Sequence, residues 1–171
     1  MTENPNFTDT LCVAILAGGP SAEADVSRNS AAQIQLALTQ AGHSASTFEL
    51  DQHCAAALIA AQPNVVFPAL HGPPGEDGTV QGMLDMLGLP YVGSDVRSSA
   101  VAMDKAIAKS VFQRAGLPVS DDCIVHPDQD LTEAASEIVH TLGTCVAIKP
   151  LNQGSAIGVQ LLPNGGDIAA A

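Results

Sequence analysis

The sequence predicts an α/β protein whose first part, up to about residue 94, forms an open parallel sheet. Two observations predict this fold class. Short apolar runs of the kind that form buried strands alternate with segments of helical spacing, and most of these elements end at glycine or proline. Ligands of open α/β sheets bind beyond the carboxyl ends of the strands, so the loops at that edge are candidate functional sites.

The first strand is predicted at residues 11–17, a continuous apolar run that is closed by the turn Gly18-Gly19-Pro20. Ser21 is a candidate cap for the helix that follows, and Gly42 is expected to end that helix. The other elements predicted in this part are a strand at 46–50, a helix at 54–61, a buried strand at 65–70, a helix at 79–87 and the start of a fourth strand at 91–92.

A domain boundary is predicted near residues 93–95, which divides the chain into domains 1–94 and 95–171. The second domain is expected to contain a helix that ends at Gly116, a strand at 119–125, a helix at 131–142, a strand at 145–149 and a return strand at 159–162. Asp167 then caps a single helical turn. Because an isolated turn does not sustain itself, we expect the chain to be interrupted within an element.

Composition excludes several classes of protein. Of 171 residues, 46% are hydrophobic and 14% are charged, which excludes a disordered chain. Six basic against 18 acidic residues give a net charge of −12, so no basic surface for nucleic acid or an anionic membrane is expected. No apolar run approaches the roughly 20 residues of a membrane span, and no signal peptide is recognisable. We therefore expect a soluble cytoplasmic protein.

The four cysteines lack the spacing of metal ligands, and two of them lie in apolar, strand-like runs. This predicts buried free thiols rather than a disulfide framework or a metal site. Any anionic ligand must be held by a few placed cations and by backbone N–H groups, since the net charge is negative. Only three lysines are present, Lys105, Lys109 and Lys149.

The strand-to-helix turn at residues 18–27 is the first candidate site. Its glycines allow a ligand to approach the backbone, and the start of the helix supplies N–H donors. Glu23 adds a carboxylate that can hold a substrate ammonium group. The alternative is an ordinary turn with a solvated acid, because the pattern is not a full dinucleotide-binding glycine motif.

The loop at residues 71–78 is the second candidate site, and it directly follows the third buried strand. His71 at that position can donate a hydrogen bond to a developing oxyanion or to a phosphate. The alternative is a purely structural hydrogen bond. Glu76 and Asp77 could indicate a metal, but neighbouring acids in a loop more often cap the next helix.

Lys149 marks the third candidate site. It leaves an apolar strand, where an ammonium group costs desolvation energy unless it meets an anion. The loop at 152–158 contains small residues and can fold its N–H groups over phosphates. It is not a Walker A loop, because the lysine precedes the glycines. The alternatives are a β-hairpin whose lysine reaches solvent and, for the isolated Lys105, a plain surface position.

Together these motifs resemble the D-alanine–D-alanine ligases of the ATP-grasp superfamily over most of the chain. The resemblance rests on five motifs in order, at residues 17–27, 69–82, 89–94, 102–105 and 148–155. It implies an N-terminal pre-ATP-grasp domain followed by the start of an ATP-grasp central domain. It also implies that ATP drives the joining of two D-alanines through an acyl phosphate, for peptidoglycan precursors.

The resemblance implies that Glu23, His71 and Ser155 are the catalytic residues. Glu23 would bind the ammonium of the first D-alanine, and Val26 would pack near its methyl group. His71 would contact the carboxylate or the acyl phosphate, and Ser155 would hydrogen-bond into the Glu23 network.

For ATP, the resemblance implies that Lys105 and Lys149 contact the phosphates, together with the loop residues Gly154, Ser155 and Ala156. Mg²⁺ is implied as well, with its ligands outside this chain, so no metal ligand is assigned here. A homodimer is a further possibility of the family. D-alanine and ATP are thus the expected partners, without nucleic acid or membrane.

The chain departs from the family at Ala24, where an arginine is common, and at Ala156, which replaces a serine. The family's metal-binding carboxylates and further catalytic residues would lie C-terminal to this sequence, so the chain is expected to be inactive alone. The alternative function is a non-catalytic fragment or degenerate paralogue that binds a D-amino acid or a nucleotide. A different carboxylate–amine ligase of the superfamily is disfavoured by the turn with Glu23 and the loop with His71.

Overall fold

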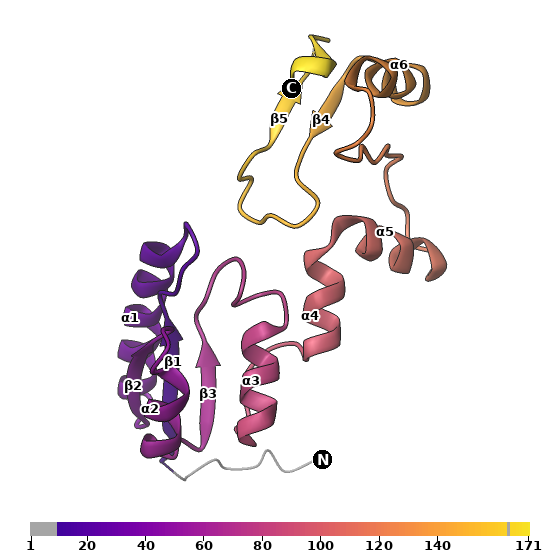
Figure 1. The fold of residues 1–171 in the computed structure, drawn as a ribbon. Helices are drawn as coiled ribbons and strands as arrows, with labels where there is room; N and C mark the ends of the chain where they lie inside the picture. The colour runs from indigo at the N-terminus through magenta and orange to yellow at the C-terminus, as the bar shows by residue number, and fades with distance from the viewer. Residues whose placement is uncertain (1–9, 164) are drawn as a thin grey trace. The chain divides into compact units, whose positions relative to one another are not determined.

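The computed structural model describes residues 10–163 and 165–171. Its elements in chain order are β1 (Cys12–Ala17), α1 (Ala24–Gln40), β2 (Ser44–Glu49), α2 (Cys54–Ala61), β3 (Val65–Pro68), α3 (Thr79–Leu87), α4 (Val96–Met103), α5 (Lys105–Arg114), α6 (Leu131–Leu142), β4 (Val146–Ile148), β5 (Gln160–Leu162) and the 3-10 helix η1 (Ile168–Ala170) (Figure 1). They form two compact units, Met1–Ala100 and Val101–Ala171. The domain limits at 94 and 95 stay a prediction.

The first unit is built on a three-stranded parallel sheet in the order β2-β1-β3. In its central strand, Ile15 pairs with Thr47 on one side and with Phe67 on the other. A strand in this position must be covered on both faces, which is why β1 is a continuous apolar run rather than an alternating one. The open parallel sheet predicted from the sequence is confirmed.

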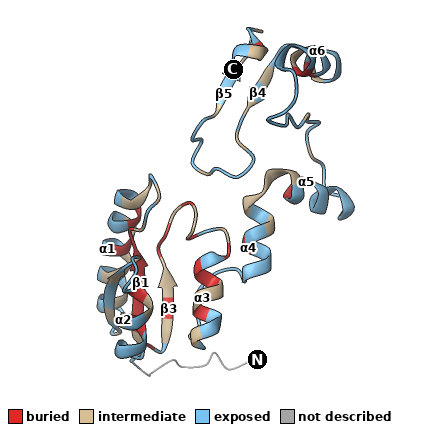
Figure 2. Ribbon diagram, viewed as in Figure 1, coloured by how far each residue is buried: buried red, intermediate tan, exposed pale blue. Residues whose placement is uncertain are grey.

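The core of this unit lies on both faces of β1 (Figure 2). Leu16 is fully buried in one cluster with Leu58 of α2 and Leu84 of α3. Ile15 is fully buried in a second cluster on the other face, with Ala31 of α1. Because both clusters depend on β1, the backbone at the carboxyl end of that strand is held firmly where the site begins.

The fourth strand predicted at 91–92 is reduced to a single parallel bridge between Tyr91 and Val66. Val66 N donates to Pro90 O (2.8 Å) and Val92 N donates to Val66 O (3.0 Å). Pro90 has no N–H to extend the ladder, and Gly93 turns the chain away with a φ of +123°. The prediction of a strand is therefore wrong beyond this bridge.

The second unit contains the antiparallel hairpin β4-β5, in which Val146 pairs with Leu162. The predicted return strand is thereby confirmed. The predicted helix at 131–142 is confirmed as α6. Asp130 caps its start, because Asp130 Oδ1 accepts hydrogen bonds from Thr132 N and Glu133 N. Asp167 caps η1 in the same way, as predicted.

The strand predicted at 119–125 is wrong: this segment has no regular secondary structure. Within the described residues of this unit, the sheet consists of β4 and β5 alone, so the segment has no strand to pair with. Conversely, helix α4 was not predicted. Asp95 Oδ1 accepts from Ser98 N (2.7 Å), which lowers the pKa of Asp95 and is the helix-start pattern that could have indicated α4.

All four cysteines are free, as predicted, but only Cys54 is buried. Cys145 is exposed, and its Sγ lies 2.9 Å from Pro163 O. The prediction of buried thiols is therefore confirmed for Cys54 alone: Cys12 and Cys123 are half-buried, and Cys145 precedes a strand of a two-stranded hairpin that leaves it exposed. None of the described helices has the length and apolar character needed to cross a membrane.

Candidate functional site

The turn between β1 and α1 is shaped by two glycines. Gly18 and Gly19 have φ values of +73° and +89°, which side-chain-bearing residues adopt only with strain. Gly18 also allows a close approach, because a Cβ there would lie 1.9 Å from Glu49 Oε1. Gly19 N donates to the same carboxylate oxygen at 3.3 Å. The turn is thus fixed to the end of β2 as well as to β1.

Ser21 does not cap α1, which begins at Ala24 with Glu23 in the N-cap position. The Ser21 hydroxyl instead accepts from Glu23 N (3.1 Å) and donates to His71 O (2.7 Å). The predicted cap is therefore wrong. The Ser21 hydroxyl stabilises the turn that precedes α1 and links this turn to the loop that contains His71. Glu23 lies at the start of α1, where backbone N–H groups point outward.

A fully buried serine, Ser27, joins the same two segments from inside α1. Its hydroxyl accepts from Gly18 N (2.9 Å) and donates to Ala69 O (2.6 Å). Ser27 was not predicted from the sequence as a residue of either site. The available signal was a hydroxyl residue on the face of α1 that also presents Ala31 and Ile34 to the core.

The loop after β3 holds His71 between two polar side chains. His71 Nε2 lies 3.4 Å from Ser30 Oγ, and His71 Nδ1 lies 4.0 Å from Glu76 Oε1. The other carboxylate oxygen of Glu76 accepts from Gly72 N at 2.8 Å. Glu76 therefore shapes this loop and does not cap α3. Asp77 Oδ1 accepts from Thr79 N, but the N-cap position of α3 is Gly78 and no side chain caps the helix, so the predicted cap is wrong for both acids.

The structure brings Glu23 and His71 to one place. Gly72 has a φ of +67°, and a Cβ on it would lie 3.3 Å from Glu23 Oε2. The Glu23 carboxylate therefore lies against the backbone directly after His71. Val26, in the first turn of α1, is 53% exposed and offers an apolar side chain in the same segment. A carboxylate, an imidazole and a valine suit a small zwitterion with a short apolar group.

An ion pair supports the turn from the outer side. Arg28 Nη2 donates to Glu49 Oε1 at 2.6 Å, and Arg28 Nη1 donates to Asp25 Oδ1 at 2.7 Å. The hydrogen bond from Arg28 lowers the pKa of Glu49, and the same contact raises the pKa of Arg28. Glu49 is thereby kept ionised as an acceptor for Gly19 N.

In the second unit, Lys105 lies against the base of the glycine-containing loop. Its Nζ donates to Gln153 O (2.7 Å) and Leu151 O (3.1 Å), and its backbone N–H also donates to Leu151 O. Asp104 caps α5 through Ala106 N and Ile107 N, which fixes the backbone of the lysine. Lys105 is therefore not a freely solvated surface residue.

The loop that follows β4 exposes backbone and small side chains. Ser155 and Ala156 have φ values of +47° and +58°, a left-handed conformation that costs about 1 kcal/mol or more per residue without glycine. Gly154 precedes them, and Lys149 is exposed at the end of β4. The structure thus places Lys105, Lys149 and the loop in the second unit, whereas Glu23, Val26 and His71 lie in the first.

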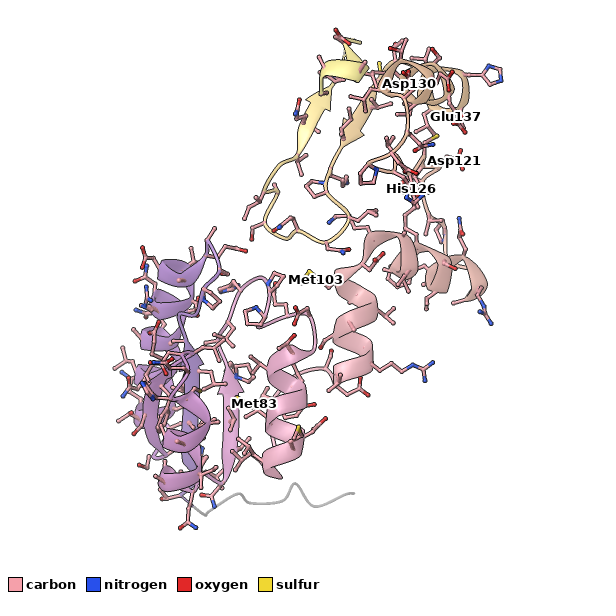
Figure 3. The ribbon with its side chains drawn as sticks, in the orientation of Figure 1. Met83, Met103, Asp121, His126, Asp130 and Glu137 are labelled. Atoms are coloured by element: carbon pink, nitrogen blue, oxygen red, sulfur yellow. The ribbon has the colours of Figure 1, made fainter. Side chains whose placement is uncertain are left out.

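Acidic side chains are frequent in the second unit, among them Asp121, Asp130 and Glu137, which lie with His126 on the segment before α6 and on α6 itself (Figure 3). Within residues 10–163 and 165–171, no group of three or more His, Cys, Asp or Glu side chains could hold a metal ion. The described residues therefore do not form a site that fits Mg²⁺, and the location of its ligands stays a prediction.

Comparison with known proteins shows similarity to one family. A family model described as D-ala D-ala ligase N-terminus matches residues 54–94. The curated D-alanine–D-alanine ligase of Moorella thermoacetica is 41% identical over 162 residues, which cover 93% of this chain and 52% of the relative. Over nearly its whole length, the chain is similar to the N-terminal half of D-alanine–D-alanine ligases.

The fold of the chain is also that of solved D-alanine–D-alanine ligases. A crystal structure of D-alanine–D-alanine ligase from Bacillus anthracis matches 94% of the chain and 52% of its own length, with a TM-score of 0.81 at 30% identity. The same enzyme complexed with ATP matches with a TM-score of 0.75, also at 30% identity, over 91% of this chain and 51% of its own. The predicted fold class, with its ATP-grasp relationship, is confirmed.

The chain spans about half the length of the curated relatives it matches. The relatives align with it from the turn at Gly18 to the loop at Ser155, since they cover about nine-tenths of its residues. The candidate residues of the first unit and those of the second unit thus both lie inside the region of similarity.

Proposed function

We propose that this chain is the N-terminal part of an enzyme that joins two D-alanines with the energy of ATP, for the synthesis of peptidoglycan precursors. The observation that carries the proposal is the Glu23 carboxylate, which lies against Gly72 directly beside His71. Similarity to D-alanine–D-alanine ligases supplies the reaction. The geometry of the first unit supplies a site for its amino-acid substrate.

D-alanine carries one cation, one anion and one methyl group, and the first unit offers a counterpart for each. Glu23 binds the ammonium, His71 donates a hydrogen bond to the carboxylate, and Val26 packs near the methyl group. Because the His71 ring lies between Ser30 and Glu76, it is oriented before substrate arrives. Such preorganised donors stabilise charge that develops on the acyl group without reorganisation.

In the proposed reaction, a carboxylate oxygen of the first D-alanine attacks the γ-phosphorus of ATP, and ADP leaves. The amine of the second D-alanine then attacks the acyl carbon, loses a proton and displaces inorganic phosphate. His71 contacts the carboxylate in the first step and the acyl phosphate in the second. No step is assigned to Mg²⁺, since the described residues do not form its site.

The second unit supplies contacts for ATP in this proposal. Lys105 and Lys149 neutralise phosphate oxygens, and the backbone N–H groups of Gly154, Ser155 and Ala156 add hydrogen bonds. A chain with a net charge of −12 needs such placed cations, because its overall field repels a nucleotide. The ATP complex of the Bacillus anthracis ligase supports nucleotide binding by a protein of this fold. Ser155 is proposed as a catalytic residue of the same loop.

A cytoplasmic location is part of the proposal, because both ATP and free D-alanine are available there. A homodimer also stays a prediction. Light scattering behind size-exclusion chromatography tests it directly: a mass of one protomer at working concentration would contradict it.

The test of the proposed function uses the full product of the gene that encodes this chain. With ATP and D-alanine, we expect release of phosphate and formation of D-alanyl-D-alanine, and with L-alanine neither. Glu23→Gln keeps the size of the side chain but removes its charge, so kcat/KM for D-alanine should fall by about 100-fold or more. Calorimetric binding of D-alanine without turnover would instead identify a non-catalytic paralogue.

A further inference from the structure

The carboxyl ends of β1 and β3 are separated by a side chain. In the register of these strands Leu16 pairs with Pro68, and Ala69 N donates to Leu16 O at 2.9 Å. In a regular parallel ladder the next hydrogen bond would run from Gly18 N to Ala69 O. The structure has the Ser27 hydroxyl between these two groups, accepting from Gly18 N (2.9 Å) and donating to Ala69 O (2.6 Å).

The Ser27 side chain lies in the interior of the first unit and not at its surface. Ser27 is fully buried, and its hydroxyl has one donor and one acceptor partner. Buried backbone groups need partners, so the hydroxyl completes the ladder while it moves the two strand ends apart. The strands therefore diverge where their loops begin, at the edge where open α/β sheets bind ligands.

Ser21 links the same two segments, the turn after β1 and the loop after β3, by a second hydrogen bond. It donates to His71 O at 2.7 Å and accepts from Glu23 N at 3.1 Å. One segment is thus held at Ser21 and Ser27, on either side of Glu23. The other is held at Ala69 and His71, two residues apart. Two fixed points on each segment define their mutual distance and orientation, which one hydrogen bond alone would not do.

We propose that Ser21 and Ser27 are positioning residues that set the separation of the Glu23 carboxylate from the His71 ring, and thereby the affinity for the first D-alanine. The inference rests on the proposed function, since it assigns the substrate's ammonium to Glu23 and its carboxylate to His71. Neither serine is assigned a contact with substrate. Each acts through the backbone of the residue that makes one.

The experiment compares Ser21→Ala and Ser27→Ala in the full gene product, with Thr39→Ala as the control. Thr39 lies in the last turn of the same helix, and its hydroxyl bonds only locally, to Gln35 O at 2.8 Å. Ser27→Ala leaves two buried backbone groups unpaired and could prevent folding. Ser21 is only partly buried, so Ser21→Ala keeps the test valid if Ser27→Ala does not fold.

The expected result is a loss in kcat/KM for D-alanine of about 10- to 100-fold. We expect this loss because the Glu23 carboxylate and the His71 ring would shift relative to each other by about 1 Å. The loss should appear in the D-alanine KM, while the KM for ATP stays within about two-fold and Thr39→Ala matches wild type. Ser21→Thr, which keeps the hydroxyl, should restore most of the affinity. A merely structural role would lower the melting temperature without this selective change.

Two outcomes would overturn the inference, and they are distinguishable. If wild-type protein turns over D-alanine and folded Ser21→Ala has an unchanged D-alanine KM, the positioning role is wrong and the proposed function stands. If wild-type protein shows no D-alanine-dependent activity and no D-alanine binding, the proposed function fails and the positioning role fails with it.

Discussion

The three lysines have different surroundings, although all lie in the second unit. Lys105 donates to two loop carbonyls, at 2.7 and 3.1 Å, and Lys109 is paired with Asp122. Lys149 is exposed at the end of β4. An ammonium group has three donors, so Lys105 keeps a hydrogen available for a phosphate while it holds the loop. We therefore propose that Lys105 both supports the loop and binds phosphate, whereas Lys149 contributes only its charge.

These differences predict separate effects of substitution. Lys105→Ala should raise the KM for ATP by about 10-fold or more and also lower the melting temperature slightly, because the carbonyls of Leu151 and Gln153 lose their donor. Lys149→Ala should raise the KM for ATP with little change in melting temperature. Lys109→Ala is the matched control, and its KM for ATP should stay near that of wild type. Equal effects of all three substitutions on KM would contradict the assignment.

At this scale, the sequence alone could predict Glu23 and His71 as candidate site residues, because each follows a strand in a loop of glycine and proline. The roles of the two serines could not be predicted. Ser21 bonds to a residue 50 positions away and Ser27 to one 42 positions away, and no local pattern encodes such contacts. The carbonyl partners of Lys105 were missed for the same reason.

Helix α2 illustrates how an element is held by one side chain. Leu58 is fully buried between the sheet and α3, while its neighbour Ile59 is 59% exposed. Leu58→Ala should reduce the free energy of unfolding by about 2–5 kcal/mol through lost burial and a cavity. Ile59→Ala removes a similar number of atoms from the same helix and should change the free energy of unfolding by less than about 1 kcal/mol. Urea unfolding of both variants measures the difference, and similar losses would show that α2 does not pack as described.

Glu49, at the end of β2, should make the stability of the protein depend on pH. The pKa of Glu49 is lowered by its hydrogen bond from Arg28, so its stabilising contribution is present above the unfolded-state pKa of about 4.3 and is lost as the pH falls through the folded-state value. Glu49→Gln should therefore lower the melting temperature at pH 7 by a small amount, since the pair is largely exposed.

As the pH falls toward 3, the melting temperatures of the variant and of wild type should converge, because the Glu49 carboxylate becomes increasingly protonated in the folded state as well as in the unfolded state. Glu137→Gln, at an exposed position of α6, is the control and should leave the melting temperature nearly unchanged at both pH values. A destabilisation by Glu49→Gln that persists at pH 3 would show that charge is not its cause.

Elements were predictable where local signals decide them. The helix at 79–87 ends at Gly88, which has a φ of +66°, and the buried run at 11–17 became β1. The segment 119–125 has strand-like composition, but a strand also requires a partner, and local sequence does not show whether one is present. Helix α4 was missed because its eight residues lack a strong apolar period.

At the scale of the whole molecule, the chemistry is divided between the two units. The first unit holds a carboxylate and an imidazole that suit an amino acid, and the second holds lysines and a small-residue loop that suit a nucleotide. The net charge of −12 does not oppose this division, because two of the three lysines lie in or beside the proposed nucleotide segment. Placed cations outweigh the overall field at short range.

The central claim is that the first D-alanine passes through an acyl phosphate, and one measurement tests it directly. D-alanine labelled with ¹⁸O in its carboxylate is incubated with ATP and the full gene product, and the released phosphate is analysed by mass spectrometry. The account predicts that each phosphate carries one ¹⁸O atom from the carboxylate, and that Glu23→Gln slows its release. Release of unlabelled phosphate alongside D-alanyl-D-alanine would contradict it.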